Sequence, residues 1–247
     1  MKTLDYALLA LTLLALLYCV KLLRALHKRV SQFNSESKKT TKELNKQIWQ
    51  SYRQSEALQQ LFALLKFTSP IPPTRGWAAS PDLLLTITDL VRTHKPRLVV
   101  ELGSGVSTLI TAKAGARKVI SIDNSGEYAA KTREMLKAHK VRGVEVRVAP
   151  LKPHKAGVNW YDTTKIKDLK RIDMLIIDGP PGSNNPESRK PALAEFISKL
   201  SPKAIIILDD VNRPGERELA EAFAKALPSH ALTIYAHEKG TAVIAPR

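Results

Sequence analysis

Two glycines, Gly103 and Gly105, stand on either side of Ser104 directly after a short apolar run, residues 98–102. The run has the composition of a buried strand, and the residues after it could begin a helix. Glycine allows the backbone to turn tightly at such a junction and leaves room for a ligand to approach it. A dinucleotide-binding turn would have a third glycine at position 108, where this chain has Thr108. Alone, the pattern predicts a nucleotide-binding turn.

An acidic residue, Asp123, ends the next apolar run and stands 20 residues after Gly103. At that distance an acid at the tip of the neighbouring strand can accept hydrogen bonds from both hydroxyls of a ribose. The alternative is that Asp123 caps the helix that follows. Because Thr108 disfavours a pyrophosphate, the combination favours the adenosine and methionine groups of S-adenosylmethionine (SAM) as the ligand.

Other residues at the same edge are expected to contact this cofactor. Glu101 lies near the end of the first strand, where its carboxylate could hold the positively charged methionine end. Ala149 ends the third predicted strand, where the adenine would lie. The predicted cofactor site therefore consists of Glu101, Gly103, Ser104, Gly105, Ser107, Asp123 and Ala149.

The order of elements around these residues predicts the fold. Runs that are apolar on both faces alternate with helical stretches, which indicates a parallel sheet covered on each side, and the last two strands are close enough to form a hairpin. The fold class is therefore α/β, a Rossmann-like, doubly wound, mostly parallel seven-stranded sheet with a C-terminal antiparallel hairpin. We expect strands over residues 98–102, 118–123, 144–149, 174–178, 204–209, 232–236 and 241–245, and helices over 107–114, 127–140, 186–200 and 215–227.

With these elements placed, the sequence resembles methyltransferase family 24, which is related to the catechol O-methyltransferase-like enzymes among the class I SAM-dependent methyltransferases. The resemblance implies the class I fold, SAM as the cofactor and methyl transfer as the reaction, and it leaves the acceptor open. The segments that carry it follow one another in order along the chain: residues 76–82, 99–105, 159–162, 177–182 and 208–213.

The resemblance also implies a transfer site at the ends of two strands. Asp178, Asp209 and Asp210 resemble the Asp, Asp and Asn that hold a magnesium-type ion in catechol O-methyltransferase-like enzymes. Oxygen ligands suit Mg²⁺, which would lower the pKa of an acceptor hydroxyl. The catalytic lysine of those enzymes is replaced here by Pro181. That departure puts their mechanism in question for this chain.

The same acids have interpretations without a metal. Asp178 or Asp210 could act as the general base or orient the acceptor. They could also form ion pairs with Arg189 or Arg213, or cap a helix. Because methyl transfer from a sulfonium is downhill, positioning could supply most of the acceleration.

Residues 1–24 are predicted to form a transmembrane signal anchor. The stretch from Tyr6 to Val20 has no charged residue, and with its flanking leucines the apolar segment reaches about 20 residues, enough to cross a hydrocarbon core. Residues 21–75 then contain 11 Lys and Arg against 3 Asp and Glu. Basic residues after the apolar run disfavour a cleaved signal peptide and favour a cytoplasmic domain. We expect a single-pass protein of the inner or plasma membrane, attracted to anionic lipid; a buried globular helix is the alternative.

Residues 25–70 are predicted to be a helical stalk, because apolar positions recur there at spacings of three and four. The stalk is interpreted as a solvated spacer, with a homodimer through a short coiled coil as the alternative. Prolines at 70, 72 and 73 would end the helix and begin the methyltransferase domain, residues 71–247. The single cysteine, Cys19, excludes an internal disulfide framework.

The net charge of +16 raises a rival function, methylation of nucleic acid. Enzymes that methylate amino groups of bases typically carry Asp/Asn-Pro-Pro and an aromatic residue after the fourth strand, whereas residues 178–182 read Asp-Gly-Pro-Pro-Gly. A second rival is a membrane-tethered scaffold without turnover. We expect instead an enzyme that O-methylates a small molecule or a glycan or lipid-linked precursor at the cytoplasmic membrane face.

Overall fold

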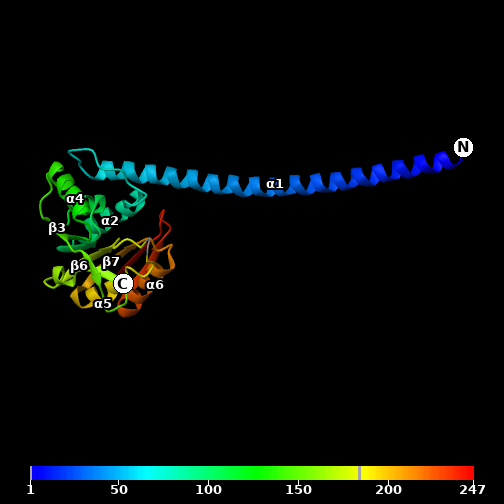
Figure 1. The fold of residues 1–247 in the computed structure, drawn as a ribbon. Coiled ribbons are helices and arrows are strands. Elements are labelled where there is room, and N and C mark those ends of the chain that lie inside the picture. The colour runs from blue at the N-terminus through cyan, green and yellow to red at the C-terminus, as the bar shows by residue number, and fades with distance from the viewer. Residues whose placement is uncertain (1, 183–184) are drawn as a thin grey trace. The chain divides into compact units, whose positions relative to one another are not determined.

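The computed structural model describes residues 2–182 and 185–247 (Figure 1). The chain divides into two compact units, residues up to Tyr52 and Arg53–Arg247. The boundary falls inside the helix α1 (Lys2–Leu64), so the last turns of α1 belong to the second unit.

The first unit is the N-terminal part of α1, which continues without a break through residues 35–41. Its apolar side chains are exposed; Leu8, for example, is 69% accessible. A window of this helix with a mean hydropathy of 2.2 is long and apolar enough to cross a membrane, as judged by length and composition alone.

The second unit begins earlier than the domain start expected at residue 71. Ala57, Leu61 and Leu65 recur every four residues along one face of α1 and the turn that ends it, and all three are buried. Gln54 fixes this segment further: its Nε2 donates to Asp82 Oδ2 at 2.7 Å, and its Oε1 accepts from the Asp82 N–H at 3.1 Å. The last turns of α1 are therefore part of the domain core rather than of a spacer.

A seven-stranded sheet forms the centre of the second unit, in the order β3-β2-β1-β6-β7-β9-β8. The first five strands of that order are parallel, while β9 runs antiparallel to both β7 and β8. This topology confirms the mostly parallel sheet with a closing hairpin. The strands are β1 (Leu98–Leu102), β2 (Lys118–Asp123), β3 (Val144–Val148), β6 (Ile172–Ile177), β7 (Leu200–Asp209), β8 (His230–Tyr235) and β9 (Thr241–Pro246).

Helices cover both faces of the sheet, because successive side chains of each strand point to opposite sides. Val99 packs in a cluster with Leu84 of α2, and Val100 packs in another with Phe223 of α6. The helices of this unit are α2 (Pro81–His94), α3 (Val106–Lys113), α4 (Gly126–Ala138), α5 (Pro191–Phe196) and α6 (Pro214–Ala226) (Figure 1).

The structure differs from the expected elements in three places. α2 lies where no helix is predicted, and a small two-stranded sheet of β4 (Leu151–Pro153) and β5 (Asn159–Tyr161) follows β3. The helix predicted over residues 186–200 is much shorter, since α5 begins only at Pro191. Proline lacks the N–H that a helix interior requires, so it is placed at a helix start.

Candidate active site

The loop between β1 and α3 contains two glycines with different roles. Gly103 has a φ of +95°, which disfavours any residue with a side chain, and a Cβ there would lie 3.3 Å from the backbone oxygen of Asp178. Gly105 has an extended backbone, and a Cβ there would meet no atom within 4 Å. Gly103 is therefore required by the turn itself, whereas Gly105 leaves space open in front of the N-terminus of α3.

Hydrogen bonds of Thr108 and Glu101 hold this loop on its buried side. The Gly105 N–H donates to Thr108 Oγ1 at 3.1 Å, and the Thr108 hydroxyl donates to Glu101 Oε2. Burial raises the pKa of Glu101 to about 7. Glu101 is fully buried beneath the loop and is not part of the wall of the cavity described below.

Asp123, at the end of β2, clamps the same loop. Its Oδ2 accepts the Ser104 N–H at 3.0 Å and the Ser104 hydroxyl, and its Oδ1 accepts the Ser125 N–H at 2.8 Å. The side chain that caps α4 is that of Ser125, whose Oγ accepts from the Tyr128 N–H. Asp123 therefore holds the glycine loop in place, and Ser125 caps the helix.

A cavity of about 840 Å³ opens at the carboxyl ends of β1, β2 and β6. This is the edge at which open α/β sheets bind ligands, and the volume lies within the range of small-molecule sites. Ala149 is fully buried and, like Glu101, is not part of the wall. Of the residues predicted for the site, the wall contains Gly103, Ser104, Gly105, Ser107, Asp123 and Asp178.

Three more side chains line this wall, of which sequence reasoning missed Tyr161 and His139. Trp77 lines it while remaining 82% exposed, so it borders the mouth. Tyr161 is buried, and its hydroxyl has no hydrogen-bond partner within residues 2–182 and 185–247. Burial raises the pKa of Tyr161 well above its usual value. His139 also lines the cavity with an unpartnered Nε2. Buried polar atoms without partners are rare, so these two indicate where a bound ligand would supply hydrogen bonds.

The three acids expected at the transfer site do converge. One carboxylate oxygen from each of Asp178, Asp209 and Asp210 lies within 4.8 Å of the others. Arg189 joins them: its Nη2 lies 2.9 Å from Asp210 Oδ2 and 3.4 Å from Asp178 Oδ1. The same guanidinium donates to the backbone oxygens of Asp178 and Asp209 at 3.0 and 3.1 Å. Arg189 therefore ties the ends of β6 and β7 together, as the ion-pair interpretation predicts.

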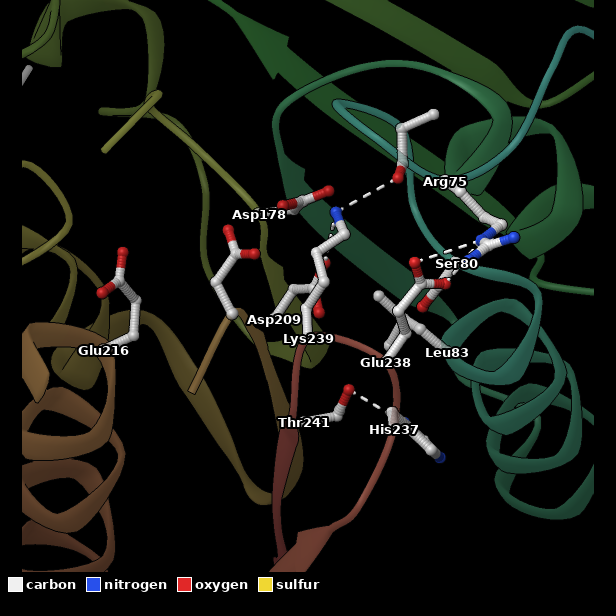
Figure 2. A network of polar contacts seen from close by, with 12 residues as sticks. Arg75, Ser80, Leu83, Asp178, Asp209, Glu216, His237, Glu238, Lys239 and Thr241 are labelled. Atoms are coloured by element: carbon white, nitrogen blue, oxygen red, sulfur yellow. Dashed lines mark hydrogen bonds and ion pairs between the residues drawn. The ribbon is translucent and has the colours of Figure 1, made fainter. Parts of the chain in front are cut away.

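Two further cations join this cluster, and Figure 2 shows one of them, Lys239, beside Asp209. Arg213 Nη1 lies 3.1 Å from Asp210 Oδ2, and Lys239 Nζ lies 3.4 Å from Asp209 Oδ2. Glu216 also pairs with Arg189 and Arg213, at 3.8 and 3.6 Å, so three cations face four acids here. Because the three expected acids are already paired with these cations, this arrangement does not fit the Mg²⁺ ion that the resemblance implies.

Asp178 is the acid of this cluster that lines the cavity. Burial raises its pKa to about 8, and the negative charge of Asp209 acts in the same direction. Arg189 and Lys239 oppose this shift. A carboxyl group with a raised pKa at the cavity wall is suited to accept a proton from an acceptor hydroxyl.

Comparisons with known proteins agree with this geometry. Residues 100–211 match the model of family 24 of the methyltransferase domain. The sequence has no match among curated proteins.

Solved structures share the fold at low sequence identity. An O-methyltransferase from Bacillus cereus in complex with SAH is 19% identical, with a TM-score of 0.55 over 78% of this chain and 90% of that one. TomG from Streptomyces achromogenes, involved in tomaymycin synthesis and solved with SAM, is 17% identical, with a TM-score of 0.51 over 69% of this chain and 82% of that one. Residues 100–211 are therefore similar to the methyltransferase domain of family 24, and the second unit shares the fold of these solved methyltransferases.

Proposed function

We propose that this protein is a SAM-dependent O-methyltransferase that acts on a small molecule or on a glycan or lipid-linked precursor. The observation that carries the proposal is one cavity lined by the Gly103–Gly105 loop, Asp123 and Asp178 together. The loop and Asp123 are suited to a nucleoside, and Asp178 is suited to an acceptor proton.

The residues present fit SAM. When bound, SAM supplies an electrophilic methyl group on a sulfonium. The open space at Gly105 admits a ligand to the N-terminus of α3, and Asp123 offers a carboxylate to ribose hydroxyls. Asp178 would receive the hydroxyl proton of the acceptor, and Trp77 would border the acceptor at the mouth.

Two measurements test the proposal. One is calorimetric titration of the full chain with SAM, and the other is transfer of labelled methyl groups to a membrane extract. We expect stoichiometric binding of SAM and a labelled low-molecular-weight or lipid product. A protein that binds SAM but labels only nucleic acid would favour the rival methyltransferase, and a protein that does not bind SAM would favour the scaffold.

We propose further that α1 anchors the enzyme in the inner or plasma membrane, with the catalytic domain on the cytoplasmic side. The exposed leucines of its first turns and the basic residues that follow them support this orientation. Exposed Trp49 and Tyr52, whose rings lie 6.0 Å apart, offer an apolar face for pairing of two stalks. Extraction of membranes at high pH tests the anchor: the protein should stay with the lipid until detergent is added.

A further inference from the structure

We propose that the ammonium group of Lys239 is the catalytic cation of this site and that it binds the oxygen of the acceptor where a metal-dependent enzyme would use a divalent ion. This inference rests on the proposed methyltransferase function and deepens it. It follows from the position of Lys239 next to the cavity wall and from its partners.

Lys239 is carried by the turn between β8 and β9, and backbone contacts hold this turn on two sides. On one side, the Asn212 N–H donates to the Lys239 oxygen at 3.1 Å and the Val211 N–H donates to the Gly240 oxygen at 3.2 Å. On the other side, the Glu238 N–H donates to Asp82 Oδ2 at 2.8 Å. The base of the lysine side chain is therefore fixed relative to the end of β7 and the start of α2.

The tip of Lys239 contacts a residue of the cavity wall, although Lys239 itself is not part of the lining. Its Nζ donates to the backbone oxygen of Ala78 at 3.1 Å, and Ala78 and Asp178 both line the cavity. Figure 2 shows the ammonium group directed toward Asp178, with Asp209 below it. The side chain is 18% exposed, so it is largely shielded from bulk water.

Asp209 explains why a cation is needed at this point. Its side chain is 1% exposed, and neither of its carboxylate oxygens has a hydrogen-bond partner within the described residues. An unpaired buried carboxylate is strongly destabilised, and Lys239 is the cation with which Asp209 forms its ion pair. An ammonium group has three donors, one of which goes to Ala78 while Asp209 orients a second. A third remains for a ligand.

With Lys239 as the cation, methyl transfer requires no metal ion. The acceptor hydroxyl gives its proton to Asp178, and the negative charge that develops on its oxygen is stabilised by the Lys239 ammonium group. The oxygen forms a bond to the methyl carbon of SAM while the carbon–sulfur bond breaks, and the sulfur keeps that electron pair as a neutral thioether. Asp178 afterwards releases the proton to solvent.

Lysine as the cation also restricts the acceptor. A divalent ion has several coordination positions and can hold two neighbouring oxygens of a catechol. Lys239 has one donor left and acts as a point charge, so it would bind one oxygen. We therefore expect acceptors in which a single hydroxyl is methylated and an adjacent hydroxyl is not required.

Lys239→Ala in the full chain tests the assignment, with Lys239→Met as the variant that keeps the apolar stem and Lys225→Gln, exposed on α6, as the control. We expect wild-type transfer to survive EDTA, and both Lys239 variants to lose about 100-fold in transfer rate while their affinity for SAM stays within about twofold, roughly 0.4 kcal/mol. Added ethylammonium should restore part of the rate to Lys239→Ala only.

Manganese supplies a readout that does not depend on turnover. Electron paramagnetic resonance should show no stoichiometric Mn²⁺ binding to the wild type and a gained site in Lys239→Ala, where the carboxylates have lost their ammonium group. Wild-type binding of Mn²⁺, the absence of that gain, or unchanged transfer by both variants would overturn the role of Lys239. A wild type that neither binds SAM nor transfers methyl groups would instead remove the proposed function, while the Mn²⁺ result still decides whether Lys239 takes the place of the ion.

Discussion

Thr108 donates its hydroxyl hydrogen to the carboxylate of Glu101 beneath the glycine loop. The contact joins the first turn of α3 to the end of β1, and both side chains are fully buried. One consequence is a loop that is already shaped before a ligand arrives, which limits the entropy lost on binding. Another is that a buried acid makes the stability of the domain depend on pH.

Glu101→Gln should remove the contribution of Glu101 to the pH dependence of stability. The ordinary pKa of this carboxyl group is 4.5 and its pKa in the folded protein is about 7, so the folded state holds the proton more tightly than the unfolded state. The stability that this preference contributes is fully present below pH 4.5 and is lost as the pH rises to 7. In urea unfolding the wild type should lose about 3 kcal/mol over this range through Glu101, and Glu101→Gln should not.

Glu218→Gln, an exposed change on α6, serves as the control and should keep the wild-type pH dependence. A Glu101→Gln protein with the same pH dependence as the wild type would show that the carboxyl group is not protonated in the fold.

Substitutions at the two glycines of the loop should have different effects, one on the stability of the fold and the other on SAM binding. Gly103→Ala places a side chain at a φ of +95° and 3.3 Å from a backbone oxygen, so it should lower the free energy of unfolding by about 1–3 kcal/mol. Gly105→Leu projects into open space and should cost about 1 kcal/mol or less. Its side chain would occupy the cavity, so calorimetry should show at least a tenfold loss of SAM affinity, about 1.4 kcal/mol. Normal SAM binding by Gly105→Leu would place the cofactor elsewhere.

The sequence predicts those parts of the site whose residues follow directly from the pattern of strands and turns nearby in the chain. That the glycine turn and Asp123 lie at one edge of the sheet can be predicted, because both follow buried strands and the strand ends of a parallel sheet share one edge. Glu101 shows the limit of that reasoning. The side chain of a residue next to a strand end points either toward the ligand or into the core. That Glu101 is buried, where it accepts from Thr108, depends on packing and not on the sequence pattern.

Contacts between distant segments were the part that could not be predicted. Lys239 meets Asp209 and Ala78 only because the β8–β9 turn lies against the start of α2. The sequence gives no period that relates these positions. The role of the last turns of α1 was missed for a similar reason, since Leu61 and Leu65 have the same spacing as a coiled-coil seam.

Asp123→Ala should weaken SAM binding through lost ribose contacts. Hydrogen bonds to a charged group contribute about 1.5–3 kcal/mol, so calorimetry should show a 10- to 100-fold weaker affinity. Ser125→Ala is the informative comparison, because Ser125 is the residue whose side chain caps α4. It should lower the free energy of unfolding by about 1 kcal/mol and leave SAM affinity unchanged. The reverse pattern would make Asp123 a structural residue.

Asp178→Asn should remove the group that takes the proton from the acceptor hydroxyl, while the cavity keeps its shape. A general base contributes about 10²–10⁴-fold, so the rate of methyl transfer should fall by that factor with little change in SAM affinity. Asp178 must be ionised to accept the proton, and its pKa of about 8 predicts a wild-type rate that rises about tenfold per pH unit below pH 8 and levels off above it. Asp89→Asn, exposed on α2, should change neither the rate nor its pH dependence. A wild-type profile that is flat between pH 6 and 9, together with an active Asp178→Asn protein, would leave orientation of the acceptor as the role of this carboxyl group.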